Sequence, residues 1–221
     1  MSQLSLETLK KEATRFVMQL SNTPIAELYG VTDGKAVGTY VEQSFNLHLA
    51  SQYTYKLGSA AKGIDFPDLN VDLKVTSIRQ PQSSCPFRNA EQKVYGLGYH
   101  LLLFVYEKRD DRQSSSAILD IQHAIFVHRA HTGDYQTTYG IGEILRRHGN
   151  RDDIVAFLEE RNLPLDEIGR EVLADRILQD PPKLGYITIS NALQWRLQYS
   201  RIINVAAVGQ TAGVERLSSD L

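Results

Sequence analysis

The sequence predicts an α/β fold in which a central mixed sheet is flanked by helices. Three observations support this prediction. The first part of the chain places apolar residues at the three-to-four spacing of amphipathic helices, and the middle of the chain shows strand patterns. After residue 138 the helical spacing returns, and the chain then shows a strand–helix–strand pattern. Because the strand patterns lie between two helical regions, we expect the sheet to form from the middle of the chain.

The helical patterns begin near the amino terminus. Ser5 can cap a helix that carries apolar residues at 6, 9, 13, 16, 17 and 20. Thr23-Pro24 fits the start of a short helix through Leu28, and a turn at residues 30–34 follows. A further helix is predicted over residues 35–50, where the apolar stripe is Val37, Val41, Phe45 and Leu49. Glu42 lies next to that stripe, so we expect it near the buried face.

The strand patterns follow a loop that contains Gly58 and Gly63. Short strand signals cover residues 64–66 and 71–76, and longer ones cover 99–107 and 118–128. The polar stretch 107–116 between the longer two predicts a hairpin connection. Farther on, helices are predicted over 141–148, 152–161 and 165–178, and a strand over 185–189. A helix from Ser190 or Asn191 through Arg201 and a strand over 202–208 complete the expectation.

Composition excludes several classes of protein. The 221 residues include 24 Lys+Arg and 26 Asp+Glu, for a net charge of −2, which argues against a polybasic protein but leaves a DNA-binding enzyme open. The single cysteine, Cys85, excludes an intramolecular disulfide and a Cys-rich zinc site. No apolar run approaches the ~20 residues of a membrane span, and no secretory signal is evident. We therefore expect a cytoplasmic globular protein.

One acidic segment carries the candidate chemistry. In Val71–Thr76 the apolar residues alternate with Asp72, Lys74 and Thr76, so the polar three share one face of a strand. A tight turn can bring Asp65 beside Asp72. Two such carboxylates form a hard-oxygen site suited to Mg²⁺, and Lys74 beside them could orient or deprotonate an attacking water. Glu42 could complete the site directly or through water.

The same residues also fit a plainer interpretation. Asp-x-Lys triplets occur on many solvated strand faces, so the triplet alone leaves catalysis open. The opposite face of this strand is fully apolar, and another acid lies upstream in the chain. That context favours a cleft.

These residues resemble the PD-(D/E)xK nuclease superfamily, the restriction endonuclease-like fold, and within it the MutH-like branch. The resemblance rests on Asp65 followed by Asp72-Leu73-Lys74, on Val37-Gly38 before Glu42, and on Gly58-Ser59. Weaker similarity covers residues 19–28, 176–186 and 190–193. Asp72 stands where MutH-like proteins can have Glu. The additional lysine of that branch has no evident counterpart, with Lys93 before the 99–107 strand and Lys108 after it.

The resemblance implies a type II restriction endonuclease that hydrolyses double-stranded DNA at a specific sequence with Mg²⁺, leaving 5′-phosphate and 3′-hydroxyl ends. It assigns metal binding to Asp65, Asp72 and Glu42 and catalysis to the same three with Lys74. It also implies one endonuclease-like domain over residues 1–221, with lobes of about 1–135 and 136–221 around a DNA cleft, and a homodimer is plausible. A MutH-type strand-nicking repair enzyme and a non-catalytic DNA-binding protein with the same fold remain alternatives.

Candidate DNA-contacting residues are polar side chains that can reach phosphates and base edges. The segment after Lys74 has no acid up to residue 90 and is rich in Arg, Gln, Ser and Thr. The candidates are Thr76, Ser77, Arg79, Gln80, Gln82, Ser83, Ser84, Gln136, Asn191 and Gln194. An ordinary polar loop is the plainer interpretation of the first seven.

Overall fold

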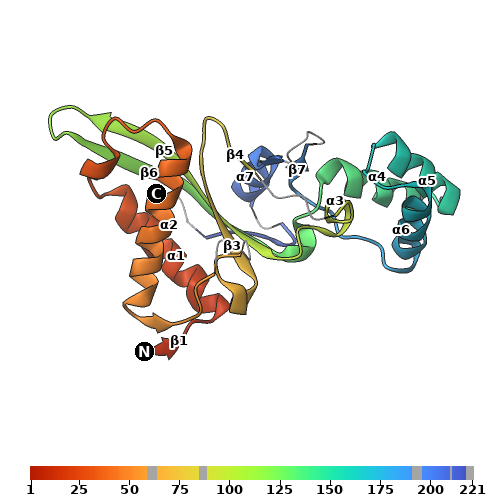
Figure 1. Ribbon diagram of the computed structural model, residues 1–221, viewed down its shortest axis with the longest axis horizontal. Coiled ribbons are helices and arrows are strands. Elements are labelled where there is room, and N and C mark those ends of the chain that lie inside the picture. Colours follow the sequence, from red (N-terminus) through yellow and green to blue (C-terminus); the bar gives the residue numbers. More distant parts are fainter. Residues whose placement is uncertain (59–63, 85–88, 191–195, 210, 218–221) are drawn as a thin grey trace. The chain divides into compact units, whose positions relative to one another are not determined.

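The computed structural model describes residues 1–58, 64–84, 89–190, 196–209 and 211–217 (Figure 1). The chain forms two compact units: unit 1 comprises Met1–Pro81, Leu101–Val127 and Ile203–Leu221, and unit 2 comprises Gln82–His100 and His128–Ile202. Each unit is therefore assembled from separate stretches of the chain. Within the described ranges, no helix has the length and apolar character needed to cross a membrane.

The sheet of unit 1 has the strand order β3-β5-β6-β9. These strands are β3 (Val71–Ser77), β5 (His100–Asp111), β6 (Ser116–Val127) and β9 (Val214–Arg216). The β5–β6 and β6–β9 pairs are antiparallel, whereas β1 (Ser2–Gln3) pairs with β2 (Tyr53–Thr54) in parallel. Strand pairs of both kinds, flanked by helices, confirm the predicted α/β class.

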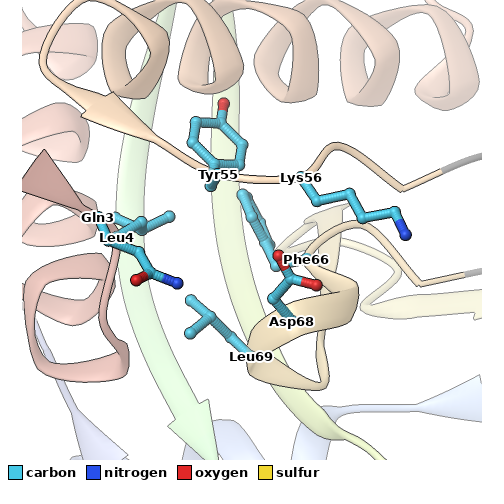
Figure 2. A pocket seen from close by; sticks show the side chains of 7 residues that line it. All are labelled: Gln3, Leu4, Tyr55, Lys56, Phe66, Asp68 and Leu69. Atoms are coloured by element: carbon cyan, nitrogen blue, oxygen red, sulfur yellow. The ribbon is translucent and has the colours of Figure 1, made fainter. Parts of the chain in front are cut away.

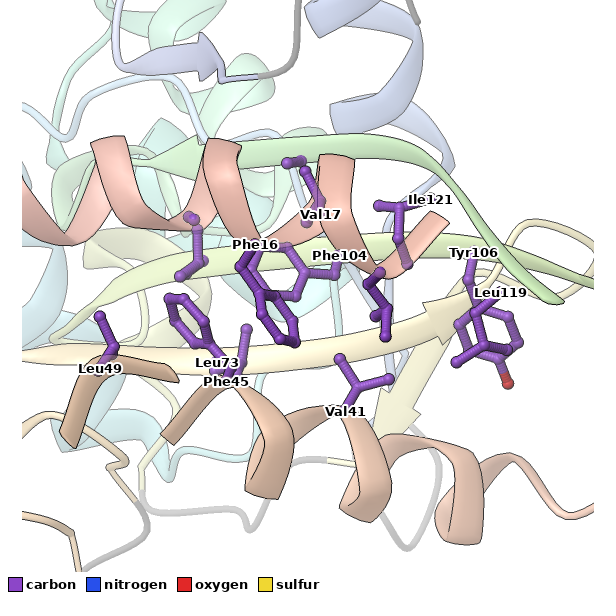
Figure 3. Close-up of a cluster of buried hydrophobic side chains, with 14 of the residues drawn as sticks. Phe16, Val17, Val41, Phe45, Leu49, Leu73, Phe104, Tyr106, Leu119 and Ile121 are labelled. Atoms are coloured by element: carbon purple, nitrogen blue, oxygen red, sulfur yellow. The ribbon is translucent and has the colours of Figure 1, made fainter. Parts of the chain in front are cut away.

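Two helices cover the sheet. α1 (Leu6–Ser21) packs on β6 and α2 (Gly34–Ala50) packs on β3, with the short 3₁₀ helix Ala26–Leu28 between them in sequence. The side chain of Ser5 accepts a hydrogen bond from the Thr8 amide, which confirms the predicted cap. The helices and strands meet in one apolar core that includes Phe16, Phe45 and Phe104 (Figure 3). This packing fixes which face of β3 is buried.

The β5–β6 hairpin is longer than the sequence predicts. The polar stretch 107–116 was expected to be a connection, but antiparallel pairing continues to Asp111 and Ser116. The turn is closed by the carboxylate of Asp111, which accepts from the Gln113 amide and from the Ser114 hydroxyl. Because residues 109–115 are exposed, they carry no apolar pattern by which a strand could be recognised.

Unit 2 combines a helical cluster with a small sheet. Its helices are α3 (Gln92–Tyr95), α4 (Tyr135–Arg146), α5 (Arg151–Glu160) and α6 (Glu167–Gln179). The last three bury residues such as Ile141, Leu158 and Ile177 in a common core. The sheet has the order β4-β8-β7, all antiparallel, formed by Gln82–Ser84, Arg196–Gln198 and Thr188–Ile189.

The predicted order of elements after residue 190 is wrong. Arg196–Gln198 forms strand β8 rather than the end of a helix, and Ser200–Val208 forms helix α7 rather than a strand. Ile202, Ile203 and Ala206 are buried at helical spacing, while Val208 is 91% exposed. The β-branched composition of this stretch suggested a strand, but the spacing of its buried residues is that of a helix.

Candidate active site

Strand β3 has one apolar and one polar face, as its alternation predicts. Leu73 is buried in the core beneath α2, while Asp72 and Lys74 project from the opposite face. Asp72 is nonetheless only 2% exposed, and the Lys74 side chain is 26% exposed. The two charged groups are therefore largely removed from water.

A tight turn places Asp65 opposite Asp72. Phe66 and Val71 form an antiparallel bridge: the Phe66 amide donates to the Val71 carbonyl at 2.9 Å, and the Val71 amide returns a bond at 3.2 Å. Between them lie the 3₁₀ turn Pro67–Leu69 and Asn70, which adopts a left-handed φ of 54°. Because Phe66 faces Val71, the residues just outside this pair, Asp65 and Asp72, are neighbours across the bridge.

The Asp65 carboxylate is also fixed by the strand. Its Oδ2 accepts a hydrogen bond from the Leu73 amide at 2.8 Å. This bond directs the side chain of Asp65 toward β3. The predicted approach of Asp65 to Asp72 is therefore present in the structure.

Asp72 and Lys74 form an ion pair, with 2.8 Å between Oδ2 and Nζ. This oxygen is buried, and its partner at that distance is the Lys74 ammonium, which can donate a hydrogen bond. Burial raises the pKa of Asp72, Lys74 opposes this rise and Asp65 contributes to it, and the resulting pKa is about 7. A buried carboxylate that lies beside a second carboxylate is a suitable ligand for a cation.

Lys74 responds to the acids around it. Burial lowers its pKa, but the negative charges of Asp72, Asp65 and Glu42 outweigh burial, so the pKa lies above its ordinary value. Glu42, half-buried on α2, has a pKa raised by burial and by the charge of Asp65. Glu42 is therefore within electrostatic range of Asp65 and Lys74, and Asp72 is within range of the same two residues.

The carboxylates of this site can be compared with the ligands that metal ions prefer. Within the described part of the chain, no group of three or more His, Cys, Asp or Glu side chains is placed to hold a metal ion, so Glu42 does not join Asp65 and Asp72 in a set of three metal ligands. Mg²⁺ usually takes only one or two protein carboxylates and completes its shell with water and phosphate oxygens. The paired carboxylates of Asp65 and Asp72 match that preference.

A small pocket lies behind the Asp65 turn. It is lined by Gln3, Leu4, Tyr55, Lys56, Phe66, Asp68 and Leu69 (Figure 2). Its volume of about 10 Å³ has room for roughly one water, so it is too small for a substrate. The rings of Tyr55 and Phe66 lie 5.8 Å apart in its wall. The pocket's lining therefore supports the turn.

The candidate DNA contacts of unit 1 differ in exposure. Arg79, with a 78% exposed side chain, and Gln80 are on the surface. Ser77 is partly exposed, and its hydroxyl oxygen accepts from the Arg79 amide at 3.3 Å. Thr76 is buried, and its hydroxyl donates to the Gln80 carbonyl at 3.2 Å. In this conformation Thr76 shapes the turn after β3.

The remaining candidates belong to unit 2 or lie outside the described residues. Gln82, Ser83 and Ser84 form β4, and the Ser83 hydroxyl lies 2.5 Å from the Tyr199 hydroxyl. Gln136 is exposed on the first turn of α4, and its side-chain oxygen accepts from Arg161 at 2.7 Å. Asn191 and Gln194 lie outside the described residues.

The two lysines considered as an additional catalytic group lie in different units of the chain. Lys108 forms an ion pair with Asp110 on the hairpin. Lys93 is buried in α3 of unit 2, where burial lowers its pKa against the opposing charge of Asp134.

Sequence reasoning missed a buried charge network in unit 1. Glu12 of α1, only 1% exposed, accepts from Arg15 at 2.7 Å and from Tyr53 at 3.1 Å, and its Oε2 lies 2.9 Å from His48 Nε2. Glu12 sits beside Ala13 within the apolar stripe of α1. An acid on a buried helix face was the available signal.

Comparison with known proteins identifies the family of the chain. The family described as "Type II restriction enzyme NspV" matches residues 3–216. A curated relative, "Type II restriction enzyme NspV" of Nostoc sp., is 55% identical over 214 residues, which cover 97% of this chain and 96% of the relative. No solved structure matches the chain. The match over nearly the whole length, together with the acidic cluster on β3, shows that the chain belongs to the NspV family of type II restriction enzymes.

Proposed function

We propose that this protein hydrolyses double-stranded DNA at a specific sequence in a Mg²⁺-dependent reaction, leaving 5′-phosphate and 3′-hydroxyl ends. The observation that carries the proposal is the cluster in which Asp65 faces Asp72 across the Phe66–Val71 bridge and Lys74 pairs with Asp72. Membership of a restriction-enzyme family supports endonuclease activity and disfavours the strand-nicking and non-catalytic alternatives.

Asp65 and Asp72 would hold the metal, with Glu42 contributing through water. When bound, Mg²⁺ would neutralise charge on the scissile phosphate and lower the pKa of a water molecule. The bond from the Leu73 amide keeps the Asp65 carboxylate oriented before any cation binds, which reduces the reorganisation that binding requires. Burial of Asp72 strengthens its interaction with a cation, because few waters compete there.

Lys74 would act as a cation toward the reacting phosphate. Its three acidic neighbours favour the charged form, which donates hydrogen bonds and cannot accept a proton. Lys74 therefore orients the attacking water and stabilises the charge that develops on the phosphate oxygens. This role replaces deprotonation of the water by Lys74.

Exposed polar side chains would contact the DNA. Ser77, Arg79 and Gln80 lie at the end of β3 and just after it, and we propose that they bind the phosphate backbone of the DNA. Gln82, Ser83, Ser84 and Gln136, together with Asn191 and Gln194, are proposed as further contacts.

We also propose PD-(D/E)xK ancestry of the MutH-like type, a homodimer on a palindromic site, and a cytoplasmic location.

Digestion of a mapped phage DNA tests the proposal. With Mg²⁺ we expect discrete fragments whose sequenced ends share one recognition sequence, and with EDTA no cleavage. Asp72→Asn and Lys74→Ala should each abolish the fragments while the folded protein still binds DNA. Cleavage that is unchanged by both substitutions would refute the assigned site. Nicks confined to the unmethylated strand of hemimethylated DNA would favour the repair alternative.

A further inference from the structure

Gly58 lies against the backbone that carries Asp65. The Gly58 amide donates a hydrogen bond to the Asp65 carbonyl at 2.8 Å. A Cβ atom at residue 58 would lie 1.9 Å from the carbonyl oxygen of Ile64, 2.8 Å from its carbonyl carbon and 3.0 Å from Asp65 Cα. All three are backbone atoms, so no side-chain rotation could relieve the overlap.

The requirement for glycine here concerns space. Gly58 is not among the residues with positive φ, so alanine could adopt its backbone conformation. Ordinary contact between non-bonded atoms lies near ~3.5 Å, so a methyl group at residue 58 must displace Ile64 and Asp65 by more than about 1 Å. The displacement would occur at the residue whose carboxylate faces Asp72.

Asp65 is held from several directions at once. Its carbonyl accepts from Gly58, its side chain accepts from Leu73, and the next residue, Phe66, is bridged to Val71. The contacts with Leu73 and Val71 come from β3 itself, whereas the Gly58 contact comes from the chain that precedes Asp65. Gly58 therefore supplies a contact with Asp65 that β3 does not supply.

We propose that Gly58 is a positioning residue, which sets the place of the Asp65 carboxylate for metal binding by allowing backbone contact that no other residue permits. This inference rests on the proposed function, because it requires Asp65 to be a metal ligand. Displacement of a reacting group by about 1 Å costs on the order of 100-fold in rate.

Gly58→Ala tests the inference. We expect the single-turnover rate of DNA cleavage to fall about 100-fold and the Mg²⁺ concentration for half-maximal cleavage to rise. Mn²⁺ binding to the protein without DNA, followed by electron paramagnetic resonance, should weaken in parallel. DNA binding in the absence of metal should stay unchanged. The matched control is Gly34→Ala in the same unit, where a Cβ would meet only the Tyr106 hydroxyl at an ordinary 3.9 Å.

A longer acidic side chain separates positioning from general damage. Asp65→Glu adds one methylene to the side chain. On the native backbone this extra length should weaken metal binding, but on a backbone displaced by Gly58→Ala it should let the carboxylate reach the metal again. We expect the double variant Gly58→Ala with Asp65→Glu to bind Mn²⁺ better than Gly58→Ala alone, a non-additivity that a merely structural defect would not produce. Additive losses in the double variant would overturn the inference.

Hydrogen exchange in the unaltered protein provides a measurement that does not depend on the folding of any variant. If metal binding requires the Gly58–Asp65 contact, Mg²⁺ binds only the form of the protein in which this hydrogen bond is intact. Mg²⁺ alone should therefore slow exchange of the Gly58 amide. Exchange that does not respond to Mg²⁺ would overturn the inference.

Asp65→Asn separates the two proposals. If this variant cleaves DNA like the unaltered protein, the proposed function of Asp65 is wrong. If it is inactive while Gly58→Ala cleaves and binds Mn²⁺ normally, the proposed function stands and the role of Gly58 is wrong.

Discussion

Lys74 Nζ lies 2.8 Å from Asp72 Oδ2, and both side chains project from the polar face of β3, opposite Leu73. A strand with a period of two places these groups side by side without any further folding. The turn that brings in Asp65 then completes a site of mixed charge. One short stretch of chain thus contains three of the four proposed catalytic residues.

Removing Lys74 should lower the cleavage rate more than it lowers DNA affinity. Loss of one group that stabilises transition-state charge costs about 100- to 1000-fold in rate. We expect Lys74→Ala to show this loss in single-turnover cleavage of a duplex oligonucleotide. Lys35→Ala, which removes an exposed lysine of the same unit, serves as control. A Lys74→Ala rate within twofold of normal would contradict the assigned role.

Arg79→Ala should weaken DNA binding and reduce its dependence on salt. The Arg79 side chain is exposed, and its ion pair with Glu107 is loose at 3.6 Å. One lost phosphate contact should reduce the slope of log K against log salt by about 0.9. Binding titrations at several salt concentrations measure the slope. Arg112→Ala, on the exposed hairpin turn, should leave the slope unchanged, and an equal slope for Arg79→Ala would exclude the contact.

The buried acid Glu12 should make stability depend on pH. Burial by itself raises the pKa of Glu12, but bonds with His48 and Tyr53 and the charge of Arg15 bring it below its ordinary value. A lowered folded-state pKa contributes stability above the unfolded pKa, and this stability is lost as pH falls through the folded value. Glu12→Gln should therefore cost about 1–3 kcal/mol near pH 7 and progressively less on acidification from about pH 4.5.

Urea unfolding at a series of pH values measures this effect. Glu7→Gln is the control, because the Glu7 side chain is 89% exposed. A difference between Glu12→Gln and the unaltered protein that is constant from pH 7 to pH 3 would show that Glu12 is not the titrating group.

Truncation of Phe45 should destabilise unit 1. Phe45 is fully buried, and its ring lies 5.0 Å from that of Phe16 and 5.4 Å from that of Phe104 (Figure 3). Phe45→Ala should cost about 3–5 kcal/mol. Leu47→Ala on the same helix removes a 73% exposed side chain and should change stability by less than about 0.5 kcal/mol. Denaturant midpoints of the two variants compare these costs directly.

Patterns with a buried side were predictable from the sequence. The stripe of Val37, Val41 and Phe45 and the alternation of β3 both lie against the core, so their periods reveal the elements and place Asp72 beside Lys74. The Asp65 turn was anticipated, but its closure depends on Asn70 in a left-handed conformation, which no local pattern required. The assignment of residues 1–221 to one endonuclease-like domain stays a prediction.

The failures occur where burial leaves little or misleading evidence. The outer part of the β5–β6 hairpin is held by backbone pairing between exposed residues, so polarity suggested a loop. In α7, Ile202 and Ile203 suggested a strand, although Ala206 continues a helical spacing. In β8, Leu197 is buried between exposed Arg196 and Gln198. This alternation fits a strand, but three residues are too few to distinguish a strand from a helix by the period of burial.

Strand β9 has a consequence for how the protein is made. It can pair with β6 only after all of unit 2 has been synthesised, and Glu215 within it accepts a hydrogen bond from Lys10 of α1. Until then the β6 edge is open to pairing with other chains, a known route to aggregation. A chain released before residue 214 would lack this closing strand and would leave the β6 edge unpaired by it.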